Sequence, residues 1–98
     1  MVKFLRIFRS PKIKDNCKHN SLKIKADFCA DPIWCKECNF NLDLDDFLIS
    51  KNLKEELTIW VLDYKKIPIN EHNKRGLALT KKVESEIGND YPIIFIEQ

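Results

Sequence analysis

The sequence has little glycine, with only two glycines in 98 residues, and it contains no repeat or low-complexity tract. This composition excludes collagen-like and other fibrous chains and is not that of a disordered linker. Long hydrophobic runs are also missing, since no run approaches the roughly 20 apolar residues that cross a bilayer. Charges interrupt the apolar residues of MVKFLRIFR too often for the core of a signal peptide. We therefore expect a cytoplasmic protein without a membrane segment.

Neither sign of charge dominates the chain, whose formal net charge is only +2. The charges are unevenly spread, however. Residues 1–25 carry eight Lys or Arg and one Asp, which gives +7, whereas residues 26–72 carry five basic and ten acidic residues, which gives −5. Such a distribution can attract a polyanion or a charged protein partner, but it often reflects only two solvated faces.

The length and composition predict one domain, residues 1–98. A chain of 98 residues that is 44% hydrophobic and 33% charged can close one core. We expect a β-rich, zinc-binding half at 1–49 and a half at 50–98 that holds two helices and a final strand. In a reducing cytoplasm, the four cysteines are better interpreted as metal ligands or buried thiols than as two disulfides.

The first half of the chain predicts three short strands. Val2 to Phe8 is rich in Val, Ile and Phe, which suits an inner strand. From Leu22 to Phe28 apolar and polar residues alternate, as in a strand with one buried face, and these two strands are expected to form a hairpin. Asp31 and Pro32 end the second strand. A third strand is predicted over 40–44, where Phe, Leu and Leu alternate with Asn and Asp.

The second half predicts two helices and one strand. Apolar residues at helical spacing indicate a helix over 50–66, capped by Ser50 or Asn52. A second helix is predicted from Glu71 to Ile87, and Gly88 is its expected stop. The final YPIIFIEQ predicts a buried strand, or an edge strand that a partner covers. The whole order predicts an α+β fold: a small, mostly antiparallel sheet with a zinc-knuckle (zinc-ribbon-like) element and two amphipathic helices.

The cysteine pattern predicts a structural zinc site. Cys35 and Cys38 form C-x2-C, and Cys17 and His19 form C-x-H upstream of it. Two short ligand segments that face each other across the ion are typical of tetrahedral Zn²⁺. Our preferred ligands are therefore Cys17, His19, Cys35 and Cys38, and Cys29 is the rival for the place of His19. Four protein ligands leave no open position to activate water, which favours structure over catalysis.

Other interpretations of these residues remain open. The thiols could be small buried hydrophobic side chains, which we accept most readily for Cys29. A redox pair at Cys35 and Cys38 would be expected to open a helix, but a strand pattern with acids follows instead. Trp34 is expected to pack over the metal and to keep solvent out. His72 could be a ligand or a general base, but its helical spacing to apolar residues favours a buried structural histidine.

Three segments resemble a known family. They are ADPIWCKECNFNLDLDDFLIS, LKEEL with the aromatic residues that follow it, and HNKRGLALTKKVESEIG. Together they resemble small uncharacterised zinc-ribbon-like proteins of Bacillus and related Firmicutes and their phages, over about residues 17–98. The resemblance implies a bacterial or phage cytoplasmic zinc domain. Cys29 departs from the family pattern, which weakens its case as a ligand.

The sequence favours a binding protein over an enzyme. No set of nucleophile, base and orienting group is visible. We expect a zinc-stabilised adaptor, inhibitor, or immunity or anti-defence factor whose partner, another protein or a second copy, covers the final strand through Ile94 and Ile96. The alternative is a nucleic-acid-binding regulator that uses the basic residues of the first half, namely Lys3, Arg6, Arg9, Lys12, Lys14, Lys18, Lys23 and Lys25.

Overall fold

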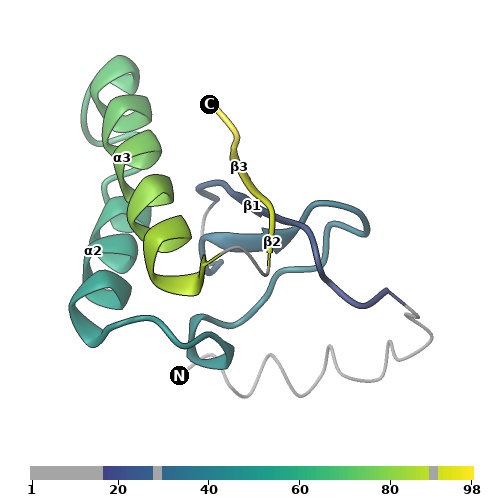
Figure 1. Ribbon diagram of the computed structural model, residues 1–98. Coiled ribbons are helices and arrows are strands. Elements are labelled where there is room, and N and C mark those ends of the chain that lie inside the picture. The colour runs from purple at the N-terminus through teal and green to yellow at the C-terminus, as the bar shows by residue number, and fades with distance from the viewer. Residues whose placement is uncertain (1–16, 28–29, 89–90) are drawn as a thin grey trace.

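The computed structural model describes residues 17–27, 30–88 and 91–98. Its described elements are the strands β1 (Leu22–Ile24), β2 (Ile33–Cys35) and β3 (Ile93–Phe95), the 3-10 helix η2 (Leu44–Asp46) and the α-helices α2 (Lys51–Leu62) and α3 (Ile69–Ile87). Figure 1 shows the two helices side by side, with the strands on one side of them. This arrangement confirms the α+β class, with a small sheet and two helices. The predicted strand at 2–8 and its hairpin lie outside the described residues.

The sheet is mixed and has the strand order β2-β1-β3. β1 pairs antiparallel with β2, so that Leu22 lies opposite Cys35, and parallel with β3, so that Leu22 lies opposite Ile93. The predicted alternation from Leu22 is confirmed, because Leu22 and Ile24 are fully buried and Lys23 between them is not. The regular strand is shorter than predicted, ending at Ile24.

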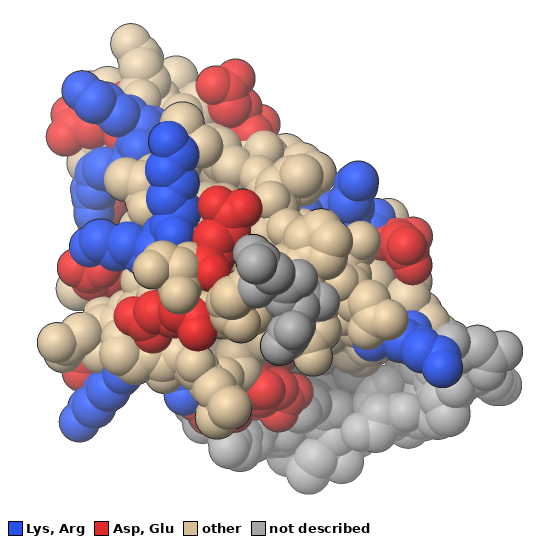
Figure 2. Space-filling model, in the orientation of Figure 1, with Lys and Arg blue, Asp and Glu red and all other residues tan. Residues whose placement is uncertain are grey.

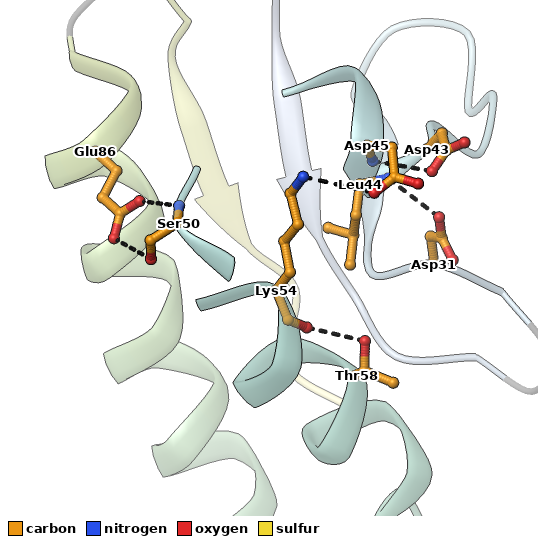
Figure 3. Close-up of polar contacts among 8 residues, drawn as sticks. All are labelled: Asp31, Asp43, Leu44, Asp45, Ser50, Lys54, Thr58 and Glu86. Atoms are coloured by element: carbon orange, nitrogen blue, oxygen red, sulfur yellow. Dashed lines mark hydrogen bonds and ion pairs between the residues drawn. The ribbon is translucent and has the colours of Figure 1, made fainter. Parts of the chain in front are cut away.

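The prediction of a strand over 40–44 is wrong. Only Asn41 forms a bridge, to Trp34, and η2 begins at Leu44. Two aspartates explain the difference, because Asp31 Oδ2 accepts the Leu44 N–H at 3.1 Å and Asp43 Oδ1 accepts the Asp45 N–H at 2.9 Å (Figure 3). Side-chain acceptors of this kind offer the backbone an alternative to a strand ladder.

β2 was not predicted from the sequence, and it begins directly after Pro32. Proline is tolerated just before the first residue of a strand, so Pro32 does not prevent this strand. Ile33 and Cys35 are fully buried, and Trp34 between them is only half-buried. Three residues are too few to give a recognisable alternation in the sequence.

The two helices are joined through Trp60 of α2 and His72 of α3. The Trp60 Nε1–H donates to the His72 carbonyl at 2.9 Å, and the His72 Nε2–H donates to the Trp60 carbonyl at 2.7 Å. Their rings stack with centroids 4.5 Å apart and an interplanar angle of 7°. Both side chains are fully buried. The interpretation of His72 as a buried structural histidine therefore agrees with its position.

The start of α2 is held by the end of α3. Ser50 rather than Asn52 is the N-cap, and its Oγ accepts the Leu53 N–H at 3.2 Å. Glu86 of α3 receives two hydrogen bonds from Ser50, one from the backbone N–H at 2.5 Å and one from Oγ at 3.0 Å (Figure 3). A carboxylate at a helix N-terminus is also favoured by the helix dipole.

We expect Glu86→Gln to lower the free energy of unfolding by about 0.5 to 1 kcal/mol. The carboxylate that accepts both hydrogen bonds is replaced by an uncharged amide, which weakens them, and the loss is small because the contact is partly exposed to water. Urea denaturation measures this change. Glu84→Gln is the matched control: it makes the same change on the exposed surface of α3, one helical turn from the helix end. Equal stability of the two variants would contradict the role of Glu86.

The core lies between the sheet and the helices. Its fully buried side chains include Leu22, Ile24, Ile33, Leu57 and Val83. Gly88 has φ of 86° and follows the last residue of α3, as predicted. Within the described part of the chain, no helix is long and apolar enough to span a membrane.

Candidate metal centre

Cys17, His19, Cys35 and Cys38 lie together, and one potential ligand atom from each is within 4.8 Å of all the others. Cys17 Sγ is 3.5 Å from Cys35 Sγ, and Cys38 Sγ is 3.5 Å from His19 Nδ1. A tetrahedral zinc site with Zn–S bonds of about 2.3 Å has sulfur atoms about 3.8 Å apart. The four residues could therefore bind a metal ion without a large rearrangement.

Both ligand segments turn around a sulfur atom. The His19 N–H points at Cys17 Sγ at 3.4 Å, and the Cys38 N–H points at Cys35 Sγ at 3.5 Å. Backbone N–H groups aimed at sulfur stabilise the thiolate form that metals require. After the second segment the chain reverses at Asn39, which has φ of 63°, and the Cys35 N–H donates to the Phe40 carbonyl at 2.9 Å.

The pKa values of the Cys35 and Cys38 thiols shift in opposite directions from the ordinary value. Burial raises the pKa of Cys35, but hydrogen bonds from the Cys38 backbone and from the side chains of His19 and Cys17 outweigh this effect and lower it from 9.0 to about 7. Burial raises the pKa of Cys38 to about 12, and the nearby sulfur atoms of Cys35 and Cys17 add to the rise. A first thiolate at Cys35 thus opposes a second, and a bound cation would remove this repulsion.

Phe40 is the aromatic neighbour of the cluster that sequence analysis missed. Its ring stacks on His19, with centroids 5.5 Å apart and an interplanar angle of 18°. Trp34, expected to pack over the metal, alternates with the inward-facing Ile33 and Cys35 on β2. Its indole N–H donates to the Lys25 carbonyl at 3.2 Å, and the Lys25 ammonium lies 4.6 Å from its ring centroid. Phe40 is thus an aromatic ring in contact with a potential ligand, although no sequence pattern marked it.

The outcome differs among the other predicted site residues. Cys29, the rival ligand, is outside the described residues. Ile94 is 39% exposed on β3, and Ile96, just after β3, is half-buried. Of the eight basic residues of the nucleic-acid alternative, Lys18, Lys23 and Lys25 are described, and Lys23 donates to Asn39 Oδ1. On the face drawn in Figure 2, positive and negative side chains are interspersed over the helices.

The geometry defines a small α+β protein with a cluster of three cysteines and one histidine that could hold a metal. The chain belongs to the Serratia CdiI immunity protein-like family, because the family model matches residues 20–71, more than half of its length. This match includes Cys35 and Cys38 and begins just after Cys17 and His19. No curated protein was found to match the chain.

Proposed function

We propose that this chain is an immunity protein that binds a toxin protein and blocks it without being an enzyme. The observation that carries this proposal is the match to the Serratia CdiI immunity protein-like family over residues 20–71. An immunity protein acts by occupying its toxin, so it needs a rigid surface rather than a catalytic site. The small sheet and the helix pair joined by Trp60 and His72 are suited to present such a surface.

We also propose that the cluster binds one structural Zn²⁺. Three cysteines and one histidine form a common ligand set of structural zinc sites, and thiolates favour Zn²⁺ over hard cations such as Mg²⁺. The Sγ atoms of Cys17 and Cys35 are 3.5 Å apart, and Cys38 Sγ is 3.5 Å from His19 Nδ1. Both distances suit this ion. When bound, the metal would join the residues before β1 to the turn after β2. It would thereby supply stability that a small core lacks.

The toxin-binding surface that we propose includes β3, with Ile94 and Ile96 among its contacts. Ile94 is 39% exposed although it is part of the sheet, and β3 is an edge strand. Exposed apolar residues on a sheet edge are common sites of protein association. The cytoplasmic location, the single domain and the resemblance to Firmicutes and phage proteins stay predictions from the sequence.

The test of this function is to produce this chain together with a candidate toxin domain in bacteria. We expect that producing the toxin domain alone stops bacterial growth and that producing this chain with it restores growth. In vitro, residual toxin activity should fall linearly and reach its minimum at a ratio of about one chain per toxin, since a binding inhibitor acts stoichiometrically.

Two outcomes would contradict the proposal. No rescue of growth, together with no complex on size-exclusion chromatography, would remove the immunity function. Inactivation of many toxin molecules by one chain would instead indicate an enzyme. The mass of the toxin after incubation gives an independent check, because we expect it to be unchanged.

A further inference from the structure

Among the described residues, no strand pairs with the outer edge of β3. The Leu22 N–H donates to the Pro92 carbonyl at 2.8 Å, and the Ile96 N–H donates to the Ile24 carbonyl at 3.0 Å, so the backbone groups of 92 and 96 point toward β1. Backbone groups alternate in direction along a strand, which directs those of Ile93 and Phe95 to the other side. Within residues 17–27, 30–88 and 91–98, the structure gives these groups no hydrogen-bond partner.

A cavity of about 270 Å³ lies beside this edge. Its lining comes from α3 and from the end of the chain, with no residue of β1 or β2: Asn70, Asn73, Lys74, Leu77, Phe95 and Glu97. Since neither β1 nor β2 contributes to the lining, the cavity lies at the β3 edge of the sheet, next to α3. Leu77 is 47% exposed, so the cavity is open to solvent. Figure 1 shows α3 running beside β3 along this side.

We infer that an extended segment of the bound toxin pairs with the outer edge of β3 as a fourth strand and places one large apolar side chain in this cavity. The inference rests on the proposed immunity function. A row of outward-facing N–H and C=O groups favours an extended backbone, since a strand can pair with alternate groups of this kind. A residue opposite Phe95 on the same face of the sheet would lie about 5 Å from it, beside Leu77.

The chemistry of the cavity defines the inserted side chain. Leu77 and Phe95 supply the apolar part of the lining. Lys74 and Glu97 carry opposite charges, and the other two residues are amides, so the cavity has no net charge to attract an ion. A leucine, methionine or phenylalanine suits this lining, and the amides can bind the backbone that enters beside it.

A second copy of this chain does not fit the edge as well. In a symmetric pairing of two β3 strands, the side chains next to the cavity would be the second copy's Ile93 and Phe95. Both are already used in the core, because Ile93 is only 8% exposed and the Phe95 ring packs 6.0 Å from Trp60. The cavity would stay unfilled, and two α3 helices would meet on the same face of the sheet. A toxin segment has no such restriction.

The first test is amide hydrogen exchange, measured by NMR on the labelled full chain with and without the unlabelled toxin domain. In the free chain we expect fast exchange at Ile93 and Phe95 and slow exchange at Ile96. Binding should slow Ile93 and Phe95 at least about tenfold. The amide of Leu48, whose side chain is 95% exposed, is the control for a general slowing. Slow exchange at Ile93 and Phe95 in the free chain would overturn the inference, since the edge would then already be covered.

The second test is Leu77→Glu, which places a charge in the cavity without disturbing the core. We expect toxin binding to weaken at least about tenfold, as for the loss of a central apolar contact. Leu62→Glu is the matched control, since Leu62 is 60% exposed on α2 and does not line the cavity. It should change the Kd less than about twofold, and circular dichroism should report both variants as folded.

The outcomes separate this inference from the proposed function. If wild type binds the toxin but Leu77→Glu binds equally well, or the amides of Ile93 and Phe95 stay fast in the complex, the toxin uses another surface and the inference fails alone. If wild type does not bind the toxin at all, the proposed function fails and the inference with it.

Discussion

Gly76→Ala should destabilise the protein by about 2 to 3 kcal/mol, the upper range for overpacking a core. A Cβ at Gly76 would lie 2.5 Å from Cζ2 of Trp60 and 2.5 Å from Cε1 of Phe95. Neither ring can move easily, because Trp60 is fixed by its hydrogen bond to His72 and Phe95 lies in a paired strand. The higher helix propensity of alanine, worth about 1 kcal/mol, offsets only part of this cost.

Urea denaturation followed by tryptophan fluorescence measures the loss. The control is Ser85→Ala, which places the same methyl group on the exposed surface of α3. This variant is expected to keep the stability of wild type or to raise it slightly, because alanine has the higher helix propensity. A Gly76→Ala protein as stable as wild type would mean that the rings are not in close contact with α3.

The contacts of Gly76 could not be predicted from the sequence. Periodicity predicted the second helix and the inward positions of His72, Leu79 and Val83, because a helix of this length repeats its apolar face several times. It did not mark Gly76 as a contact point for Phe95, because that contact joins residues distant in sequence. The α2 cap shows the same limit: the sequence offered Ser50 and Asn52, and the contact with Glu86 of the other helix holds Ser50.

The strands were harder to predict than the helices. Each described strand has three residues, which gives alternation little room to appear. The segment at 40–44 has the burial pattern of a strand, since Leu42 and Leu44 are buried, but capping by Asp31 and Asp43 turns it into η2. Strand order depends on long-range pairing, which one sequence does not encode in any local pattern.

The cluster of Cys17, His19, Cys35 and Cys38 was largely predictable, because the spacing of potential ligands is a local property of the sequence. C-x2-C and C-x-H each place two ligand atoms on one turn, and the structure brings the two turns together. The contacts around the cluster were not predicted. Phe40 and Glu37 flank Cys38 in the sequence, but what their side chains contact depends on how the two turns face each other. Phe40 stacks on His19, and a carboxylate oxygen of Glu37 lies 3.9 Å from Cys17 Sγ.

Removing the metal should have the largest effect of any change considered. We expect native mass spectrometry to find one Zn²⁺ per chain and treatment with a chelator to lower the free energy of unfolding by at least about 4 kcal/mol. A bound metal would connect the residues before β1 to the turn after β2. Without it, that half would be held only by three-residue strands and by the packing of their buried side chains against the helices. Loss of structure should therefore concentrate in residues 17–46, while α2 and α3 stay helical by circular dichroism.

Two variants distinguish the fourth ligand. His19→Ala should lose the metal or bind it at least about tenfold more weakly, because His19 Nδ1 lies 3.5 Å from Cys38 Sγ. Cys29→Ala is the matched control and should keep one Zn²⁺ per chain. Metal retained in His19→Ala but lost in Cys29→Ala would reverse this assignment. A wild-type protein without metal would reopen the redox interpretation of Cys35 and Cys38.

The pH dependence follows from proton competition at the thiols. In the metal-free protein the pKa of Cys35 is about 7 and that of Cys38 is about 12. At pH 8 the Cys38 thiol must therefore lose a proton to bind Zn²⁺, and below pH 7 the Cys35 thiol must lose one as well. Zinc affinity should fall with falling pH, by at least about tenfold per unit and more steeply below pH 7. Titration with a competing zinc indicator at pH 8, 7 and 6 checks this, and an affinity that rises on acidification would exclude thiolate ligands.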